Sequence, residues 1–121
     1  MKTILLAEDD PFITDIYLSR LKQRGYKVDI ARDGQMALEK IKNNYPDLLI
    51  LDINLPKING CQLLKIVRQD LKTKNLKVIV ISNFRQEDYP ENISGLGVIK
   101  YFLKMETVPE DIVNSVEEIL N

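Results

Sequence analysis

The sequence predicts an α/β fold in which a parallel sheet is covered by helices on both faces. Short apolar runs, typical of buried strands, alternate along the chain with stretches whose apolar residues recur at helical spacing. Two of the runs stop abruptly on acidic residues, Glu8, Asp9 and Asp10 after the first and Asp52 after a later one. Since ligands bind parallel sheets at the carboxyl ends of the strands, we expect a functional site where these acids meet.

Each expected element has a recognisable sequence signal. Five strands are expected, at residues 2–7, 27–31, 47–51, 77–81 and 98–103. Four helices have clear starts: Asp10 with Pro11, Asp33 with Gly34, Gly60, and a capping box of Thr107 with Glu110. The third helix is expected to bury the apolar side chains of Leu63, Leu64, Val67 and Leu71.

The segment between Phe84 and Gly97 fits the alternating pattern poorly. A fourth helix is expected there, yet Pro90 interrupts it and Gly95 and Gly97 close it. We therefore expect this helix to be short, kinked or partly unwound.

Composition narrows the class of protein. The chain has 121 residues, enough for one domain, with a formal net charge of −1, which argues against a general affinity for nucleic acid. The basic residues between 65 and 77, Arg68 among them, are interpreted as a solvated helix end and loop. With one cysteine and no histidine, an internal disulfide, a zinc site and a histidine-based triad are excluded, and a cytoplasmic location is expected. No run approaches the roughly 20 apolar residues of a membrane span.

The acidic cluster favours a hard cation. Carboxylates crowded at neighbouring strand ends repel one another unless a cation lies among them, and Mg²⁺ and Ca²⁺ prefer oxygen ligands. The alternative is that Glu8, Asp9 and Asp10 only favour a helix N-terminus, each contributing roughly 0.3–1 kcal/mol.

The segments from Leu6 to Pro11 and from Asp52 to Gly60, followed in order by Ser82, Tyr101 and Lys104 at later strands, resemble the receiver domain of bacterial two-component response regulators. The resemblance covers essentially the whole chain, so residues 1–121 are expected to form a single receiver domain. It implies a flavodoxin-like, doubly wound five-stranded sheet in the order 2-1-3-4-5, with five helices, the fourth short or irregular.

The resemblance also implies a role for each site residue. Asp52 matches the phosphoacceptor, and Glu8 and Asp9 match the acidic pair that binds Mg²⁺ together with Asp52 and the backbone carbonyl of Asn54. Ser82 matches the hydroxyl that senses the phosphoryl group, and Lys104 matches the lysine that pairs with it. Tyr101 is either the aromatic residue that changes rotamer on activation or a half-buried strand residue. Met105 follows the lysine where the family commonly has proline.

The function implied is a signalling module rather than an enzyme with an external substrate. Asp52 would accept a phosphoryl group from the phosphohistidine of a sensor histidine kinase or histidine phosphotransfer protein, and the change would be read by an effector domain or downstream protein. No direct contact with nucleic acid or membrane is expected. One alternative is a degenerate receiver that acts as an interaction module without phosphorylation. A small phosphohydrolase is disfavoured, because such enzymes usually carry a second aspartate where Asn54 stands.

Overall fold

Five parallel strands form one sheet in the order β2-β1-β3-β4-β5 in the computed structural model, which describes residues 1–85, 87 and 93–121. The strands are β1 (Thr3–Ala7), β2 (Lys27–Ala31), β3 (Leu48–Asp52), β4 (Val78–Ser82) and β5 (Val98–Leu103). The fold class and the strand order expected from the sequence are confirmed. Asp52 is the last residue of β3, whereas the sequence placed it directly after a strand of residues 47–51.

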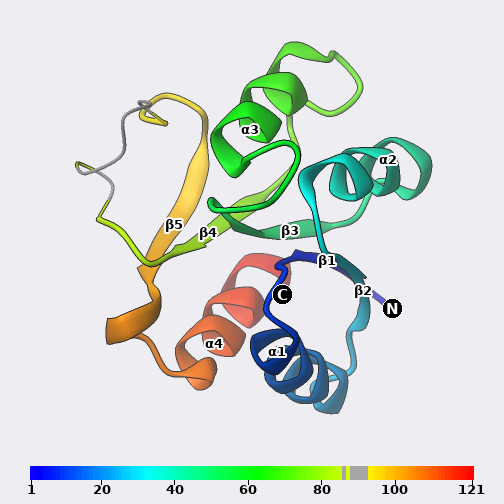
Figure 1. Ribbon diagram of the computed structural model, residues 1–121. Helices are drawn as coiled ribbons and strands as arrows, with labels where there is room; N and C mark the ends of the chain where they lie inside the picture. Colours follow the sequence, from blue (N-terminus) through cyan, green and yellow to red (C-terminus); the bar gives the residue numbers. More distant parts are fainter. Residues whose placement is uncertain (86, 88–92) are drawn as a thin grey trace.

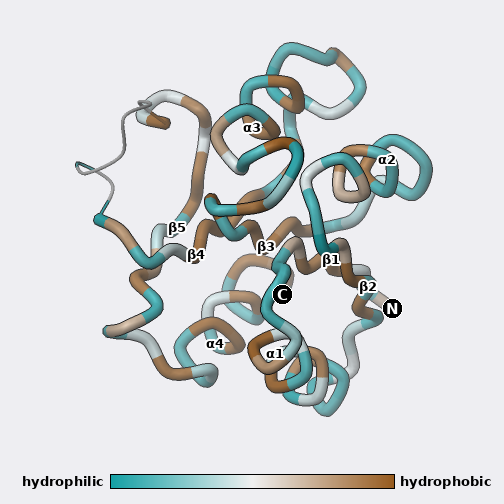
Figure 2. Tube along the Cα trace, viewed as in Figure 1, coloured by the Kyte–Doolittle hydropathy of each residue, from teal (hydrophilic) through white to brown (hydrophobic). Residues whose placement is uncertain are grey.

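Helices cover both faces of this sheet (Figure 1). On one face lie α2 (Gly34–Asn44) and α3 (Gly60–Gln69), and on the other lie α1 (Pro11–Gln23) and α4 (Pro109–Leu120). Successive residues of β3 alternate between two apolar cores: Leu49 and Leu51 belong to the core beneath α2 and α3, and Leu48 and Ile50 to the core beneath α1 and α4. The central strands are accordingly hydrophobic along their length, whereas the outer turns of the helices are mostly hydrophilic (Figure 2).

Side-chain caps fix the starts of the first three helices. Asp10 accepts a hydrogen bond from the backbone N–H of Phe12, and Asp33 accepts one from that of Met36. Asn59 and Gln62 form a reciprocal capping box at the start of α3. The starts expected at Pro11, Gly34 and Gly60 are therefore confirmed.

The capping box expected at Thr107 and Glu110 is wrong. The last helix begins at Pro109, and the carboxylate of Asp111, not that of Glu110, accepts the backbone N–H of Val108 at 3.1 Å. Glu110 instead pairs with Arg20 and Arg24 of α1, each at 2.9 Å. Proline at the first helical position moves the start by one residue, and the opposing arginines attract the glutamate.

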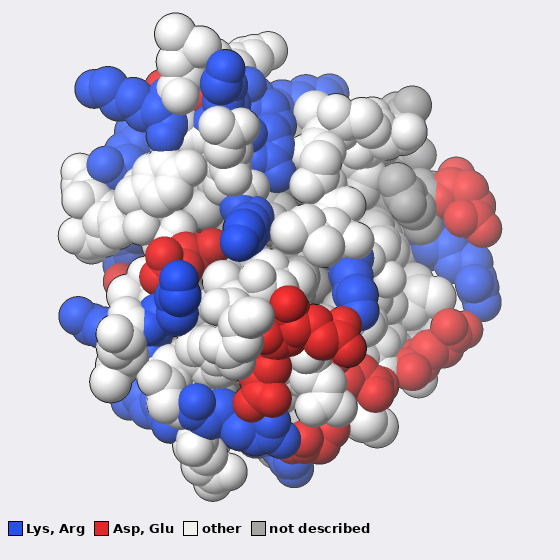
Figure 3. Space-filling model, turned by 180° about the vertical axis from the view of Figure 1, so that it is seen from behind, with Lys and Arg blue, Asp and Glu red and all other residues white. Residues whose placement is uncertain are grey.

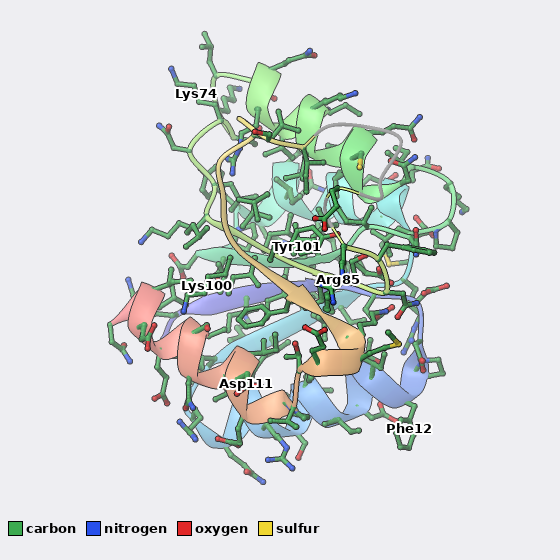
Figure 4. The ribbon with its side chains drawn as sticks, turned by 90° about the vertical axis from the view of Figure 1, so that its left-hand side faces the viewer. Phe12, Lys74, Arg85, Lys100, Tyr101 and Asp111 are labelled. Carbon is green, nitrogen blue, oxygen red and sulfur yellow. The ribbon has the colours of Figure 1, made fainter. Side chains whose placement is uncertain are left out.

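Two expectations around α3 are also wrong. The helix ends at Gln69, so Leu71 lies outside it and is 81% exposed. Arg68 is half-buried, and its guanidinium donates to the carbonyls of Leu76 (2.7 Å) and Leu96 (2.6 Å). The lysines of this stretch are exposed as expected, Lys74 among them (Figure 4).

Most of the irregular fourth helix expected between Phe84 and Gly97 falls on residues 86 and 88–92, which lie outside the described residues. The described part after them, Ile93–Gly97, forms a turn that leads into β5. Viewed from behind, basic side chains gather at the upper left, basic and acidic side chains adjoin one another elsewhere, and no single charge covers the surface (Figure 3). Within residues 1–85, 87 and 93–121, no helix has both the length and the apolar character needed to span a membrane.

Candidate functional site

The expected acidic residues meet at the carboxyl ends of β1 and β3. These strands are paired neighbours, with Ala7 opposite Leu51, so the residues that follow each strand lie side by side. Glu8, Asp9 and Asp52 each offer a carboxylate oxygen, and the three oxygens lie within 4.8 Å of one another. Glu8 is fully buried and Asp52 is 2% exposed, whereas Asp9 is open to solvent.

Lys104 brings a cation to this cluster from the end of β5. Its Nζ lies 2.7 Å from Oε1 of Glu8 and donates a hydrogen bond to Oδ2 of Asp52 at 3.1 Å. The lysine is the first residue of a 3₁₀ turn, η2 (Lys104–Glu106), and its side chain is only 15% exposed. Lys104 therefore reaches Asp52 although Met105, and not proline, follows it.

Burial shapes the electrostatics of Glu8. Removal from water, followed by hydrogen bonding with the Asp52 carboxyl, raises the pKa of Glu8 to about 7, although Lys104 acts in the opposite direction. For Lys104, burial alone would lower the pKa, but contacts with the Glu8 and Asp52 carboxylates outweigh burial and raise the pKa above its ordinary value. Glu8, Asp52 and Lys104 thus form one cluster of interacting charges.

One oxygen of Glu8 makes this cluster suitable for a metal ion. Oε2 accepts the backbone N–H groups of Asp9 (3.0 Å) and Asp10 (3.3 Å), but buried Oε1 has no hydrogen-bond donor of acceptable geometry among the described residues. The ammonium of Lys104, 2.7 Å away, is its partner, so this buried oxygen lies where a positive charge is accommodated. The all-oxygen donor set fits Mg²⁺, so the residues present are compatible with the expected cofactor.

Asn54 contacts the same centre through its backbone. Its N–H donates to Oδ1 of Asp52 at 3.0 Å, so the two oxygens of the Asp52 carboxylate have different partners, Asn54 on one side and Lys104 on the other. The Asn54 side chain is exposed. The role of its carbonyl as a metal ligand stays a prediction.

Ser82 and Tyr101 are linked through the backbone of Phe84. Ser82 ends β4 next to the strand that carries Asp52, is fully buried, and accepts the N–H of Phe84 on its Oγ at 3.1 Å. The half-buried Tyr101 donates its hydroxyl to the carbonyl of Phe84 at 2.7 Å. In Figure 4 Tyr101 lies on β5, on the same side of the molecule as Arg85. The loop after β4 is therefore held from both sides.

The link through Phe84 was not expected from the sequence. Serine commonly accepts a hydrogen bond from the backbone N–H two residues later, so the Ser82 half of the link had a detectable signal. The Tyr101 half depends on the packing of β5 against β4, which brings together residues 17 positions apart.

Known proteins resemble this chain over nearly its whole length. The sequence model of the response regulator receiver domain family matches residues 4–117. The polar-differentiation response regulator DivK of Brucella ovis is 27% identical over 111 residues, which cover 92% of this chain and 90% of that protein.

Solved structures agree with the sequence matches. A putative response regulator from Chloroflexus aurantiacus is 36% identical with a TM-score of 0.83, and covers 98% of this chain and 97% of its own. A CheY-like receiver domain protein from Methanospirillum hungatei is 29% identical with a TM-score of 0.85, and covers 98% of this chain and 92% of its own.

Proposed function

Because the chain belongs to the receiver domain family of response regulators, we propose that it accepts a phosphoryl group on Asp52 in an Mg²⁺-dependent reaction. The donor would be a phosphohistidine on a sensor histidine kinase or a histidine phosphotransfer protein. Residues 1–121 would form one receiver domain acting in the cytoplasm, with an effector domain or downstream protein as the reader.

The chemistry follows from the groups around Asp52. A carboxylate oxygen of Asp52 forms a bond to phosphorus while the nitrogen–phosphorus bond of the donor breaks, and the imidazole keeps the electron pair and takes up a proton. A Mg²⁺ ion bound to Glu8, Asp9, Asp52 and the Asn54 carbonyl would neutralise phosphoryl charge.

The ammonium group of Lys104 would help to position the arriving phosphoryl group. The ammonium group of Lys104 lies 3.1 Å from Asp52, close enough to pair with an oxygen of the arriving phosphoryl group. Pairing there would exchange one of its present carboxylate contacts for a phosphoryl contact. The contact between Lys104 and the two buried carboxylates is the observation on which the proposal chiefly depends.

Ser82 and Tyr101 could transmit the effect of Asp52 phosphorylation from the site to the surface. If the Ser82 side chain turns so that its hydroxyl donates to the phosphoryl group, its Oγ moves, and the loop that contains Phe84 would follow, since the Phe84 N–H donates to that Oγ. The Phe84 carbonyl holds Tyr101, so a shift of this loop changes the surface beside β5. We take Tyr101 to report the state of Asp52.

Intact mass spectrometry tests the proposal. The protein is incubated with acetyl phosphate, with Mg²⁺ or with EDTA, and we expect one added phosphoryl group only with Mg²⁺. Asp52→Asn should abolish labelling, whereas the control Asp15→Asn, an exposed carboxylate on α1, should label as the parent chain does. Labelling of Asp52→Asn, or no labelling of the parent chain, contradicts the proposal, and the second result favours an interaction module that works without phosphorylation.

A further inference from the structure

The loop that follows the phosphoacceptor lies against the start of α2. We call residues 53–59, between β3 and α3, the acceptor loop. The backbone N–H of Gly34 donates to the carbonyl of Pro56 at 3.0 Å, and Lys57 Nζ lies 3.5 Å from Oδ2 of Asp33. Figure 1 shows the two segments side by side, above the sheet edge at which β3 ends.

This contact leaves no room for a side chain at Gly34. A Cβ atom there would lie 1.8 Å from the carbonyl oxygen of Ile58 and 2.6 Å from its carbonyl carbon. Both atoms are backbone, so they can retreat only if the acceptor loop itself moves. Reaching ordinary contact at 3.4 Å would require a displacement of more than 1 Å.

The acceptor loop also has a strained backbone. Lys57 has a φ of 69°, and the N–H of Ile58 donates to the carbonyl of Pro56 at 2.9 Å, which closes a tight three-residue turn around Lys57. A non-glycine residue in this region is strained and persists only when the surrounding structure holds it. The start of α2 is the neighbour that holds this turn from the side.

Movement of this loop would be transmitted to the site. The loop begins directly after Asp52, its Asn54 N–H donates to Asp52 Oδ1, and its Ile53 carbonyl accepts the Gly60 N–H at 2.8 Å. Its two ends are thus fixed to the phosphoacceptor and to α3, while its middle rests on Gly34.

We propose that Gly34 is a positioning residue for phosphoryl transfer, acting through the acceptor loop on Asp52 and on the carbonyl of Asn54. The inference rests on the proposed function of Asp52. A misplacement of about 1 Å in a reacting group can cost 100-fold in rate, so a methyl group at Gly34 should affect chemistry more than it affects stability.

The test compares Gly34→Ala with Gly25→Ala. Gly25 lies between α1 and β2, has a φ of 89° and has no atom within 4 Å of the place that a Cβ would take, so alanine there strains the backbone far from the site. Each variant is measured for urea unfolding, for Mg²⁺ affinity and for the rate of labelling by acetyl phosphate at saturating Mg²⁺, under conditions where it is folded. We expect Gly34→Ala to slow labelling at least tenfold and to weaken Mg²⁺ binding, and Gly25→Ala to change both less than twofold.

The outcomes separate the two proposals. If the parent chain is not labelled at all, the proposed function fails. If the parent chain is labelled and Gly34→Ala labels within twofold of it, the positioning role is overturned. If Gly34→Ala does not fold, Lys57→Gly carries the test, because glycine accepts the positive φ and breaks the contact with Asp33. A threefold or greater loss of rate without loss of stability in Lys57→Gly supports the positioning role, and an unchanged rate overturns it.

Discussion

The buried carboxyl of Glu8 predicts an unusual pH dependence of stability for the metal-free protein. In the unfolded chain Glu8 loses its proton near its ordinary pKa of 4.5, whereas in the folded protein burial and the Asp52 carboxyl raise the pKa to about 7. The folded state therefore binds more protons than the unfolded state between these two values, and the free energy of unfolding falls as pH rises through this window. The contribution of Glu8 is fully present below pH 4.5 and is lost by about pH 7.

The size of the effect follows from the shift. Each pKa unit corresponds to about 1.4 kcal/mol, so the shift of Glu8 from 4.5 to about 7 corresponds to a loss of roughly 3–4 kcal/mol as an upper limit. The other shifted carboxyls do not interfere. The pKa values of Asp33 and Asp47 are lowered, chiefly by backbone N–H donors from Met36 and Thr3, so their contributions are lost only at more acidic pH.

Urea unfolding in EDTA from pH 4.5 to 7.5 measures this dependence, with Glu8→Gln as the matched variant. The amide has the shape of the protonated acid but does not ionise, so its stability should change less across the window than that of the parent chain. The proposed binding of Mg²⁺ to the ionised form should reverse the loss at neutral pH, by about 2.7 kcal/mol at a concentration 100 times its dissociation constant. Parallel pH profiles for the parent chain and Glu8→Gln would refute the assignment.

Two further predictions concern single side chains. Lys104→Met leaves two buried carboxylates without their cation and should lower the free energy of unfolding by about 3–5 kcal/mol at pH 7.5 in EDTA, but by less at pH 5, where Glu8 takes up a proton. The control Lys100→Met removes an exposed ion pair with Glu118. An equal loss at both pH values, or an equal loss in the control, speaks against this prediction. Arg68→Met leaves the carbonyls of Leu76 and Leu96 without their donor and should lower the free energy of unfolding in urea by about 2–4 kcal/mol. The control Arg32→Met, at an exposed position, should lower it by under about 0.5 kcal/mol. Similar losses in the two variants would show that Arg68 behaves as a surface residue.

The sequence predicted the parts of this protein that local patterns determine. Apolar runs that end at acidic residues predicted β1 and β3. They also predicted that Glu8, Asp9 and Asp52 lie at one end of the sheet, because parallel strands present their carboxyl ends at the same edge. The starts at Asp10 and Asp33 were also correct, since capping depends on residues only a few positions apart. The strand order needed the family resemblance, because alternation alone allows several orders.

What the sequence did not predict depends on contacts between distant segments. Arg68 has the charge of a solvated residue, and only folding brings the carbonyls of Leu76, before β4, and Leu96, before β5, to its guanidinium. Glu110 stands where a capping box needs it, but Arg20 and Arg24 on another helix attract it. Gly34 reads as an ordinary helix start, and its closeness to Ile58 follows from how α2 meets the acceptor loop.

Charge counting explains why metal binding should precede phosphorylation. With all groups ionised, the carboxylates of Glu8, Asp9 and Asp52 and the single ammonium of Lys104 leave two net negative charges at the centre. The raised pKa of Glu8 shows how the metal-free protein reduces this charge, by favouring a proton. A divalent cation balances the same charge without a proton and leaves Lys104 free to exchange a carboxylate for a phosphoryl oxygen. A phosphoryl group approaching the metal-free centre would meet uncompensated charge of its own sign, so labelling without Mg²⁺ should be slow even though every protein group is in place.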